Sequence, residues 1–141
     1  MSIRFASIGT GWIAGEFLKG AREVEGLEYT EGYSRIQEKG EEFAKQWGAQ
    51  KVYTDLEAMA EDKEIDAVYI ASPNALHYSQ SKLFLQHGKH VICEKPITVE
   101  PEQLMELQQL AEQKGLVYME ALIGVYLPEM RILQGAVERL G

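Results

Sequence analysis

Short apolar runs alternate along the chain with longer segments that have the spacing of amphipathic helices. The runs are typical of buried strands and occupy residues 3–8, 27–34, 52–53, 66–71, 90–93 and 116–119. Helices are predicted between them, at residues 13–23, 37–47, 55–59, 76–88 and 101–115. Because parallel strands need crossover connections, this alternation predicts an α/β fold with a parallel sheet and helices on both faces.

Several residues mark where the predicted helices begin and end. Asp55 stands at an N-cap position, Pro101 in a first turn, and Gly48 just after a last turn. Beyond the last predicted strand, apolar residues at spacings of four and three predict one more helix: Tyr126, Met130, Leu133, Val137 and Leu140. We therefore divide the chain into a domain at residues 1–121 and a helical segment at residues 122–141 that would lead into a second domain.

Composition narrows the class of protein. Of the 141 residues, 45% are hydrophobic and 26% are charged, as in an ordinary globular protein. The net charge of −8 argues against a nucleic-acid-binding surface, which needs clustered Lys and Arg. With a single cysteine, Cys93, no intrachain disulfide can form, and no apolar run approaches the ~18 residues of a membrane helix. These features predict a soluble cytoplasmic protein.

A glycine-rich turn follows the first predicted strand and opens the first predicted helix. Gly9, Gly11 and Ala14 have the G-x-G-x-x-A spacing of the dinucleotide-binding fingerprint of the doubly wound Rossmann fold. Gly9 would permit the tight turn, Gly11 would leave room for a pyrophosphate, and the amides near Trp12 and Ile13 would face the anion. Two alternatives remain open: a turn without a ligand, and a methyltransferase that binds S-adenosylmethionine. The position between a strand and a helix favours the dinucleotide.

The end of the second predicted strand carries the residues expected to select the cofactor. An Asp or Glu there would bind the ribose 2′-hydroxyl of NAD. This chain has Ser34 and Arg35 instead, and Lys39 follows in the next helix. A hydroxyl and two cations suit the 2′-phosphate of NADP, which a carboxylate would repel. We therefore predict NADP, with NAD as the alternative if Arg35 and Lys39 only form a solvated helix start.

Four short segments, taken in their order and spacing, resemble one family. They are Gly9 to Ala14, then Ser72-Pro73-Asn74-Ala75-Leu76-His77, then Glu94-Lys95-Pro96, and finally Met119-Glu120-Ala121. Together they resemble the N-terminal domain of the Gfo/Idh/MocA oxidoreductases, which include glucose-fructose oxidoreductase and inositol dehydrogenase. The resemblance covers essentially the whole chain and is greatest to the branch that contains the dihydrodiol dehydrogenases and glucose-fructose oxidoreductase.

This resemblance implies roles for residues of these segments. Lys95 would be catalytic, beside the nicotinamide ribose, where an ammonium stabilises charge on the substrate oxygen during hydride transfer. Cofactor contacts are implied for residues after the fourth and fifth strands: Ser72, Pro73, Asn74, His77, Glu94 and Lys95. Glu120 would fix nearby loops. From spacing alone, Lys95 would be an exposed loop lysine and His77 a partly buried histidine. No metal site is predicted.

The resemblance also implies a second domain, because family members continue beyond the point where this sequence ends. We expect the NADP(H)-binding domain of an oxidoreductase acting on a sugar- or polyol-like secondary alcohol or ketone, with little turnover on its own. The alternatives are a stand-alone dinucleotide-binding module or sensor, and a subunit completed by another polypeptide. Val125 stands where the related branch usually has an arginine, so its substrate contacts are not carried over. Apolar surface that a second domain would cover should favour self-association.

Overall fold

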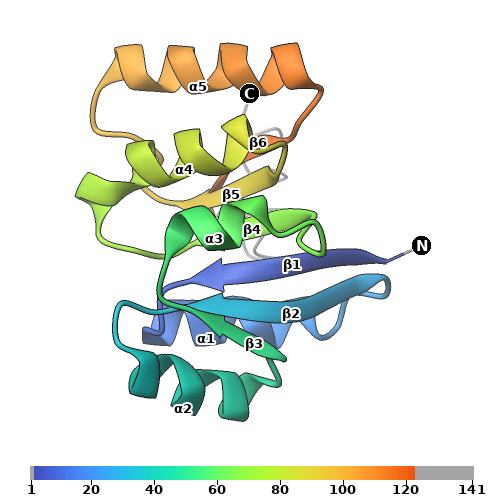
Figure 1. Cartoon of the computed structure of the whole chain (residues 1–141). Helices are drawn as coiled ribbons and strands as arrows, with labels where there is room; N and C mark the ends of the chain where they lie inside the picture. The colour runs from blue at the N-terminus through green and yellow to red at the C-terminus, as the bar shows by residue number, and fades with distance from the viewer. Residues whose placement is uncertain (1, 123–141) are drawn as a thin grey trace, which may run out of the picture.

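The computed structural model describes residues 2–122, in which strands and helices alternate (Figure 1). The strands are β1 (Ile3–Ile8), β2 (Leu27–Tyr33), β3 (Lys51–Tyr53), β4 (Ala67–Ile70), β5 (His90–Glu94) and β6 (Tyr118–Ala121). The helices are α1 (Trp12–Ala21), α2 (Gln37–Trp47), α3 (Leu56–Glu61), the 3-10 turn η1 (Asn74–Leu76), α4 (His77–Gln86) and α5 (Pro101–Lys114). The strands and helices predicted up to residue 121 are thus all present.

The strands form one parallel sheet in the order β3-β2-β1-β4-β5-β6. The chain runs outward from β1 to β3, returns through α3, and then runs outward in the other direction from β4 to β6. The order therefore reverses between β1 and β4. In open α/β sheets the ligand crevice lies beyond the carboxyl ends of the strands at this reversal. The predicted doubly wound sheet is confirmed.

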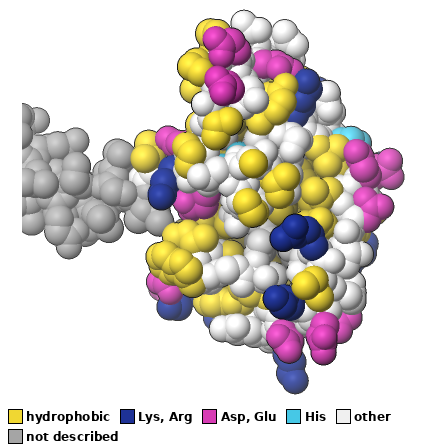
Figure 2. Space-filling model, turned by 90° about the vertical axis from the view of Figure 1, so that its left-hand side faces the viewer, with side chains coloured by type: hydrophobic (Ala, Val, Ile, Leu, Met, Phe, Trp, Pro, Cys, Tyr) yellow, Lys and Arg dark blue, Asp and Glu magenta, His cyan; other side chains and the backbone are white. Residues whose placement is uncertain are grey.

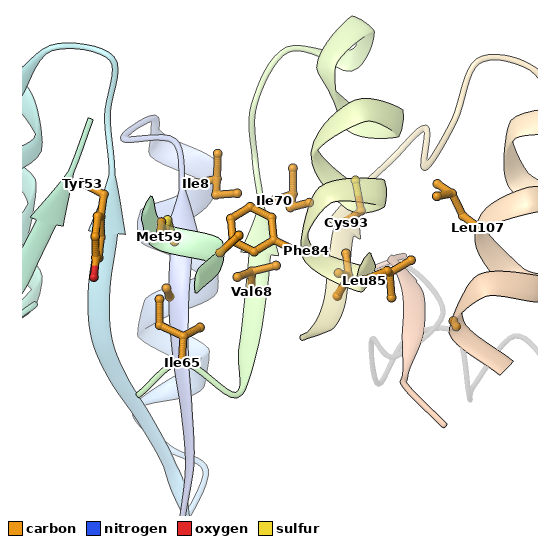
Figure 3. Close-up of a cluster of buried hydrophobic side chains, with 14 residues drawn as sticks. Ile8, Tyr53, Met59, Ile65, Val68, Ile70, Phe84, Leu85, Cys93 and Leu107 are labelled. Carbon is orange, nitrogen blue, oxygen red and sulfur yellow. The ribbon is translucent and has the colours of Figure 1, made fainter. Parts of the chain in front are cut away.

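Helices pack on both faces of the sheet. On one face, α3, α4 and α5 cover alternate residues of three neighbouring strands, namely Ala6, Ile8, Val68, Ile70, Val91 and Cys93. Figure 3 labels Ile8, Val68, Ile70 and Cys93 among them. On the other face, Leu18 of α1 and Phe43 of α2 share a cluster with Phe5 and Tyr69 of the sheet. Phe17 of α1 stacks on Tyr69 with ring centroids 3.7 Å apart. Successive side chains of each strand point to opposite faces of the sheet and thus separate two cores.

The predicted helix boundaries have clear local causes. Gly48 and Gly115 follow α2 and α5 with φ angles of 85° and 66°, values in the left-handed region that favours glycine. The Asp55 carboxylate accepts hydrogen bonds from the amides of Glu57 and Ala58 at the start of α3. The N-cap and both C-cap assignments depend only on local backbone needs, which explains why the sequence reveals them.

The predicted boundaries lie within two residues of the observed ones, and two of the differences have a clear local cause. The last strand begins at Tyr118 instead of residue 116, because the Leu116 amide donates to the Ala111 carbonyl (2.8 Å) and still belongs to the end of α5. The helix predicted at residues 76–88 begins one residue later, after the turn η1, in which the Leu76 amide donates to Pro73 (2.8 Å). The apolar stripe between residues 126 and 140 lies outside the described residues.

Part of the sheet face beside α1 is apolar and open within residues 2–122. A groove of about 260 Å³ on this face includes Phe17, Tyr69 and Ile92 in its lining. Its lining also includes the exposed apolar side chains of Ile3 and Val117. This surface is compatible with the self-association expected from the sequence, which stays a prediction. No helix in this part of the chain is long and apolar enough to cross a membrane.

Asp62, in the turn between α3 and β4, gives the stability of the domain a defined pH dependence. The Tyr53 hydroxyl, the Glu64 amide (2.8 Å) and the Lys51 ammonium (3.0 Å) all donate to its carboxylate. Of these donors, the Tyr53 hydroxyl contributes most, and together they lower the pKa of Asp62 from 3.8 to about 2. Because the folded pKa is the lower one, the stabilisation is complete above pH 3.8 and is lost as the pH falls towards 2.

We predict that Asp62→Asn lowers the free energy of unfolding at pH 7 by about 1 kcal/mol, after allowance for solvent screening of the partly exposed turn. The difference between the two proteins should shrink as the pH falls from 3.8 towards 2, because Asp62 then becomes protonated and neutral like asparagine. Urea denaturation at several pH values measures it. A destabilisation of equal size at pH 2 and pH 7 would contradict an electrostatic origin.

Candidate functional site

A groove of about 540 Å³ lies at the carboxyl ends of β1, β2 and β4, at the reversal of strand order. This size lies within the range of about 300–1,000 Å³ that ligand pockets occupy. Three segments form most of its wall: residues 8–10 at the end of β1, residues 33–36 with Lys39 at and after the end of β2, and residues 71–73 with Leu76 after β4. Figure 2 faces this edge and shows Lys and Arg side chains beside hydrophobic ones, with acidic side chains mostly at the periphery.

The fold requires glycine at position 9, whether or not a ligand is bound. The φ of Gly9 is +109°, and a Cβ built there would lie 2.6 Å from the carbonyl oxygen of Ala71, in the loop that follows β4. A side chain would therefore be strained and would also displace the neighbouring loop. The Gly9 amide donates to the Tyr33 carbonyl (3.3 Å), which ties the turn to the end of β2. The prediction that Gly9 permits the tight turn is confirmed by these contacts.

Gly11 has no such constraint within the described chain. It is the N-cap of α1, with φ −79°, and a Cβ built there would meet no atom within 4 Å. No side chain caps this helix, and its first turn carries no acidic residue. The amides at the start of α1 therefore face open space, as an anion-binding helix start requires. Trp12 is 79% exposed beside this space, and Ile13 is half-buried.

The end of β2 presents two cations to the groove. Arg35 and Lys39 are exposed, line its wall, and form no ion pair within residues 2–122. Ser34 is buried, and its hydroxyl accepts a hydrogen bond from the Ile36 amide (3.2 Å). Gly40 allows α2 to lie close to this turn, because a Cβ there would be 3.1 Å from the Ser34 Cβ. The three residues predicted to select NADP are thus together on one wall.

The loop after β4 forms the opposite wall. Ser72 and Pro73 line the groove, and the Ser72 hydroxyl donates to Gln80 of α4 (2.6 Å). Asn74 is exposed at the start of η1. His77 is fully buried, and its ring lies between the carbonyls of Ser72 and Pro96 instead of on the groove wall. Cofactor contact by Asn74 and His77 stays a prediction, and sequence spacing gave no sign of the His77 contacts.

The loop that carries Lys95 follows β5 at the same edge of the sheet. Lys95 is exposed and lies outside the residues that line the groove. Glu94 is buried: one carboxylate oxygen accepts from the Tyr69 hydroxyl (2.6 Å) and the other from the Lys95 amide (3.3 Å). Burial, followed by the hydrogen bond to Glu94, raises the pKa of Tyr69. Glu94 therefore supports the backbone of Lys95 from within the sheet.

Glu120, at the end of β6, supports the same loop from the other side. Its carboxylate accepts a hydrogen bond from the Ile97 amide (2.9 Å). The expectation that Glu120 fixes nearby loops is therefore confirmed. Cys93, one residue before Glu94, is fully buried, and burial raises the pKa of its thiol to about 12, so that it remains a protonated core side chain.

Sequence analysis missed Tyr69 and Gln80 as parts of this site. Tyr69 was indistinguishable from other apolar residues of a buried strand, although a tyrosine hydroxyl in such a run signals a buried hydrogen-bond partner. Gln80 lies one helical turn after the Ser72 loop, and nothing in its spacing indicated a contact. Gln80 also lines the groove, whereas Tyr69 lies behind it in the sheet and acts through Glu94.

A parallel sheet of this order, with a glycine turn and cations at the reversal, defines a dinucleotide-binding domain. A family model described as "Oxidoreductase family, NAD-binding Rossmann fold" matches residues 3–122, and the chain belongs to this family, the Gfo/Idh/MocA oxidoreductases. It is thus an NAD(P)-binding domain of the oxidoreductase type, as its resemblance implied.

Individual relatives show the same similarity. The chain is 44% identical over 139 residues to the scyllo-inositol 2-dehydrogenase (NADP(+)) IolU of Bacillus subtilis, covering 99% of this chain and 42% of that protein. It is 29% identical to the trans-1,2-dihydrobenzene-1,2-diol dehydrogenase of Mus musculus, covering 95% and 41%. A crystal structure of the 3-ketoreductase KijD10 from Actinomadura kijaniata with NADP and TDP-benzene has a TM-score of 0.93 and 28% identity, covering 99% and 43%. The chain thus spans about two fifths of the length of these relatives.

Proposed function

We propose that this chain binds NADP(H) in the groove, in preference to NAD(H). The observation that carries the proposal is the pair of cations, Arg35 and Lys39, on the groove wall at the end of β2, where NAD-binding domains place a carboxylate. A doubly charged 2′-phosphate would gain hydrogen bonds from both, with Ser34 at the same turn. The NADP named for the relatives IolU and KijD10 supports the same choice.

The free chain fits such a cofactor along the groove. The pyrophosphate would lie over Gly11, where the helix start is open and uncapped. Exposed apolar side chains of Ile36 and Leu76 contribute to the two facing walls and offer surfaces for the adenine. The groove, together with the adjoining start of α1, would thus offer separate places for base, 2′-phosphate and pyrophosphate. Because the chain belongs to an oxidoreductase family, we set the methyltransferase alternative aside.

We further propose that the protein containing this domain transfers hydride to or from a secondary alcohol or ketone of sugar or polyol type. The bound nicotinamide would carry the hydride, and Lys95 would orient the substrate oxygen and stabilise its charge. The inositol, dihydrodiol and 3-keto compounds implied by the relatives' names support this substrate class. Hydride transfer also needs a substrate held against the nicotinamide, so for this chain as it stands we propose cofactor binding.

Titration with NADPH and then NADH, followed by tryptophan emission, tests the proposal. NADPH should bind at least about tenfold more tightly, because the 2′-phosphate adds charged hydrogen bonds. Trp12 lies beside the glycine turn, so its emission should be quenched. Trp12→Phe should remove most of the quenching while calorimetry still detects binding. Equal affinities would overturn the NADP preference, and no binding of either nucleotide would overturn the proposed function.

A further inference from the structure

The buried ring of His77 faces a carbonyl oxygen at each of its nitrogens. Nδ1 lies 2.7 Å from the Pro96 carbonyl and Nε2 lies 2.8 Å from the Ser72 carbonyl. A carbonyl oxygen only accepts hydrogen bonds, whereas a neutral imidazole has a single N–H. A neutral ring would therefore point one nitrogen lone pair at an oxygen lone pair, in a site where no side-chain surface is open to water. An imidazolium ring satisfies both contacts.

The contact with Pro96 continues into a carboxylate. The Pro96 carbonyl and the Ile97 amide belong to the same peptide group, and that amide donates to Glu120 (2.9 Å). His77 and Glu120 therefore hold opposite ends of one peptide, with a donor on its oxygen and an acceptor on its N–H. A cation at one end and an anion at the other strengthen both hydrogen bonds, because each polarises the peptide in the same direction.

The titratable groups of the adjoining strand ends are Glu94 at the end of β5, Lys95 directly after it and Glu120 in β6, besides the protonated thiol of Cys93. Of these, Glu120 is linked to the ring through the Pro96–Ile97 peptide, Glu94 is hydrogen-bonded to Tyr69, and Lys95 is exposed. On α4 itself the neighbouring titratable group is Tyr78, whose hydroxyl is hydrogen-bonded to Glu106 (2.6 Å).

We propose that His77 is an imidazolium that donates from both nitrogens and, with Glu120, fixes the Pro96–Ile97 peptide, so that it acts as a positioning residue for Lys95. The loop after β4, which lines the cofactor groove, is thereby tied to the loop that carries Lys95. The charge state of the ring is independent of any ligand. The consequence for Lys95 rests on the proposed function, because it assumes that Lys95 lies at the nicotinamide end of the cofactor.

Nitrogen NMR of the whole chain, labelled at histidine, tests the charge state directly. The chain has three histidines, and two separate variants, His87→Gln after α4 and His90→Gln at the start of β5, assign the spectrum without touching His77. His90 is an internal reference for a neutral ring, because its Nδ1 accepts a hydrogen bond from the Val117 amide (2.9 Å). At about pH 8, where an ordinary imidazole is neutral, both nitrogens of His77 should carry a proton. A bare nitrogen on His77 would overturn the proposal.

Glu120→Gln tests the link through the peptide. The amide oxygen of glutamine can still accept from Ile97, but the negative charge is gone, so the ring of His77 should lose one proton at the same pH. The matched control is Glu112→Gln, which removes one charge from an exposed position of α5 and should leave the His77 signals unchanged. A ring that stays doubly protonated in Glu120→Gln would overturn the role of Glu120.

The positioning role is tested by comparing two ligands with His77→Gln. NADPH reaches both ends of the groove, whereas adenosine 2′,5′-bisphosphate occupies only the adenine end. If His77 positions the Lys95 loop, the variant should weaken NADPH about tenfold or more and leave the bisphosphate within about twofold. Equal weakening of both ligands would show a general structural defect and overturn the positioning role. If neither ligand binds the unaltered chain, the proposed function fails while the NMR result still decides the state of His77.

Discussion

Gly11→Ala should abolish tight NADPH binding and leave the fold intact, whereas Gly9→Ala should unfold or strongly destabilise the free domain. A methyl group on Gly11 meets no atom of the chain, so its cost is that of alanine at an N-cap, at most about 1 kcal/mol. The same methyl occupies the space that the pyrophosphate needs. Loss of one or two charged hydrogen bonds, each worth about 1.5–3 kcal/mol, corresponds to a loss in affinity of about 100-fold.

Gly9→Ala provides the contrast. The backbone at this position has a φ of +109°, and the added Cβ would lie 2.6 Å from the Ala71 carbonyl oxygen. The substitution should therefore lower the free energy of unfolding of the ligand-free chain by about 2–4 kcal/mol. Urea denaturation without cofactor and calorimetric titration with NADPH separate the two effects. If Gly11→Ala binds NADPH as well as the unaltered chain does, the pyrophosphate does not lie at the start of α1. If Gly9→Ala is as stable as the unaltered chain, the turn is not constrained as described.

Replacing Arg35 and Lys39 together by alanine should weaken NADPH by about 100-fold and leave NADH within about threefold. Each cation would donate a charged hydrogen bond to the 2′-phosphate, worth about 1.5–3 kcal/mol, and NADH has no group at that position. Both side chains are exposed and form no ion pair among the described residues, so their loss should not disturb the fold. Calorimetric titration of the double variant with both nucleotides measures the change.

The control for the loss of charge is Lys45→Ala. Lys45 is exposed in the last turn of α2, on the same helix as Lys39 but away from the groove lining. Lys45→Ala changes the net charge in the same direction as the double variant. Any loss of NADPH affinity that it causes therefore reflects the overall negative charge of the protein and not a contact with the nucleotide. A double variant that weakens NADPH and NADH equally would show that Arg35 and Lys39 do not recognise the 2′-phosphate. Raised salt should reduce the NADPH advantage of the unaltered chain, since exposed cations are screened.

The Lys95 loop shows where sequence reasoning reached its limit. The sequence places Lys95 directly after a buried strand, and parallel strands end at one edge, so its position near the groove followed from topology. The three side chains that hold the loop come from β5, α4 and β6: Glu94, His77 and Glu120. Their contacts depend on which strands are neighbours and in what register, which periodicity does not specify.

The sequence by itself determined the alternation of strands and helices, the helix caps, and the residue types at the glycine turn and at the end of β2. These properties depend on local backbone needs and on burial, which neighbouring residues encode. Only the tertiary structure decided that Gly9 must be glycine because of Ala71, that His77 is buried between two loops, and that Glu94 is hydrogen-bonded to Tyr69. Apart from the contact between His77 and Ser72, these contacts join residues far apart in the chain, which meet only when the strand order brings the ends of β1, β4, β5 and β6 to one edge.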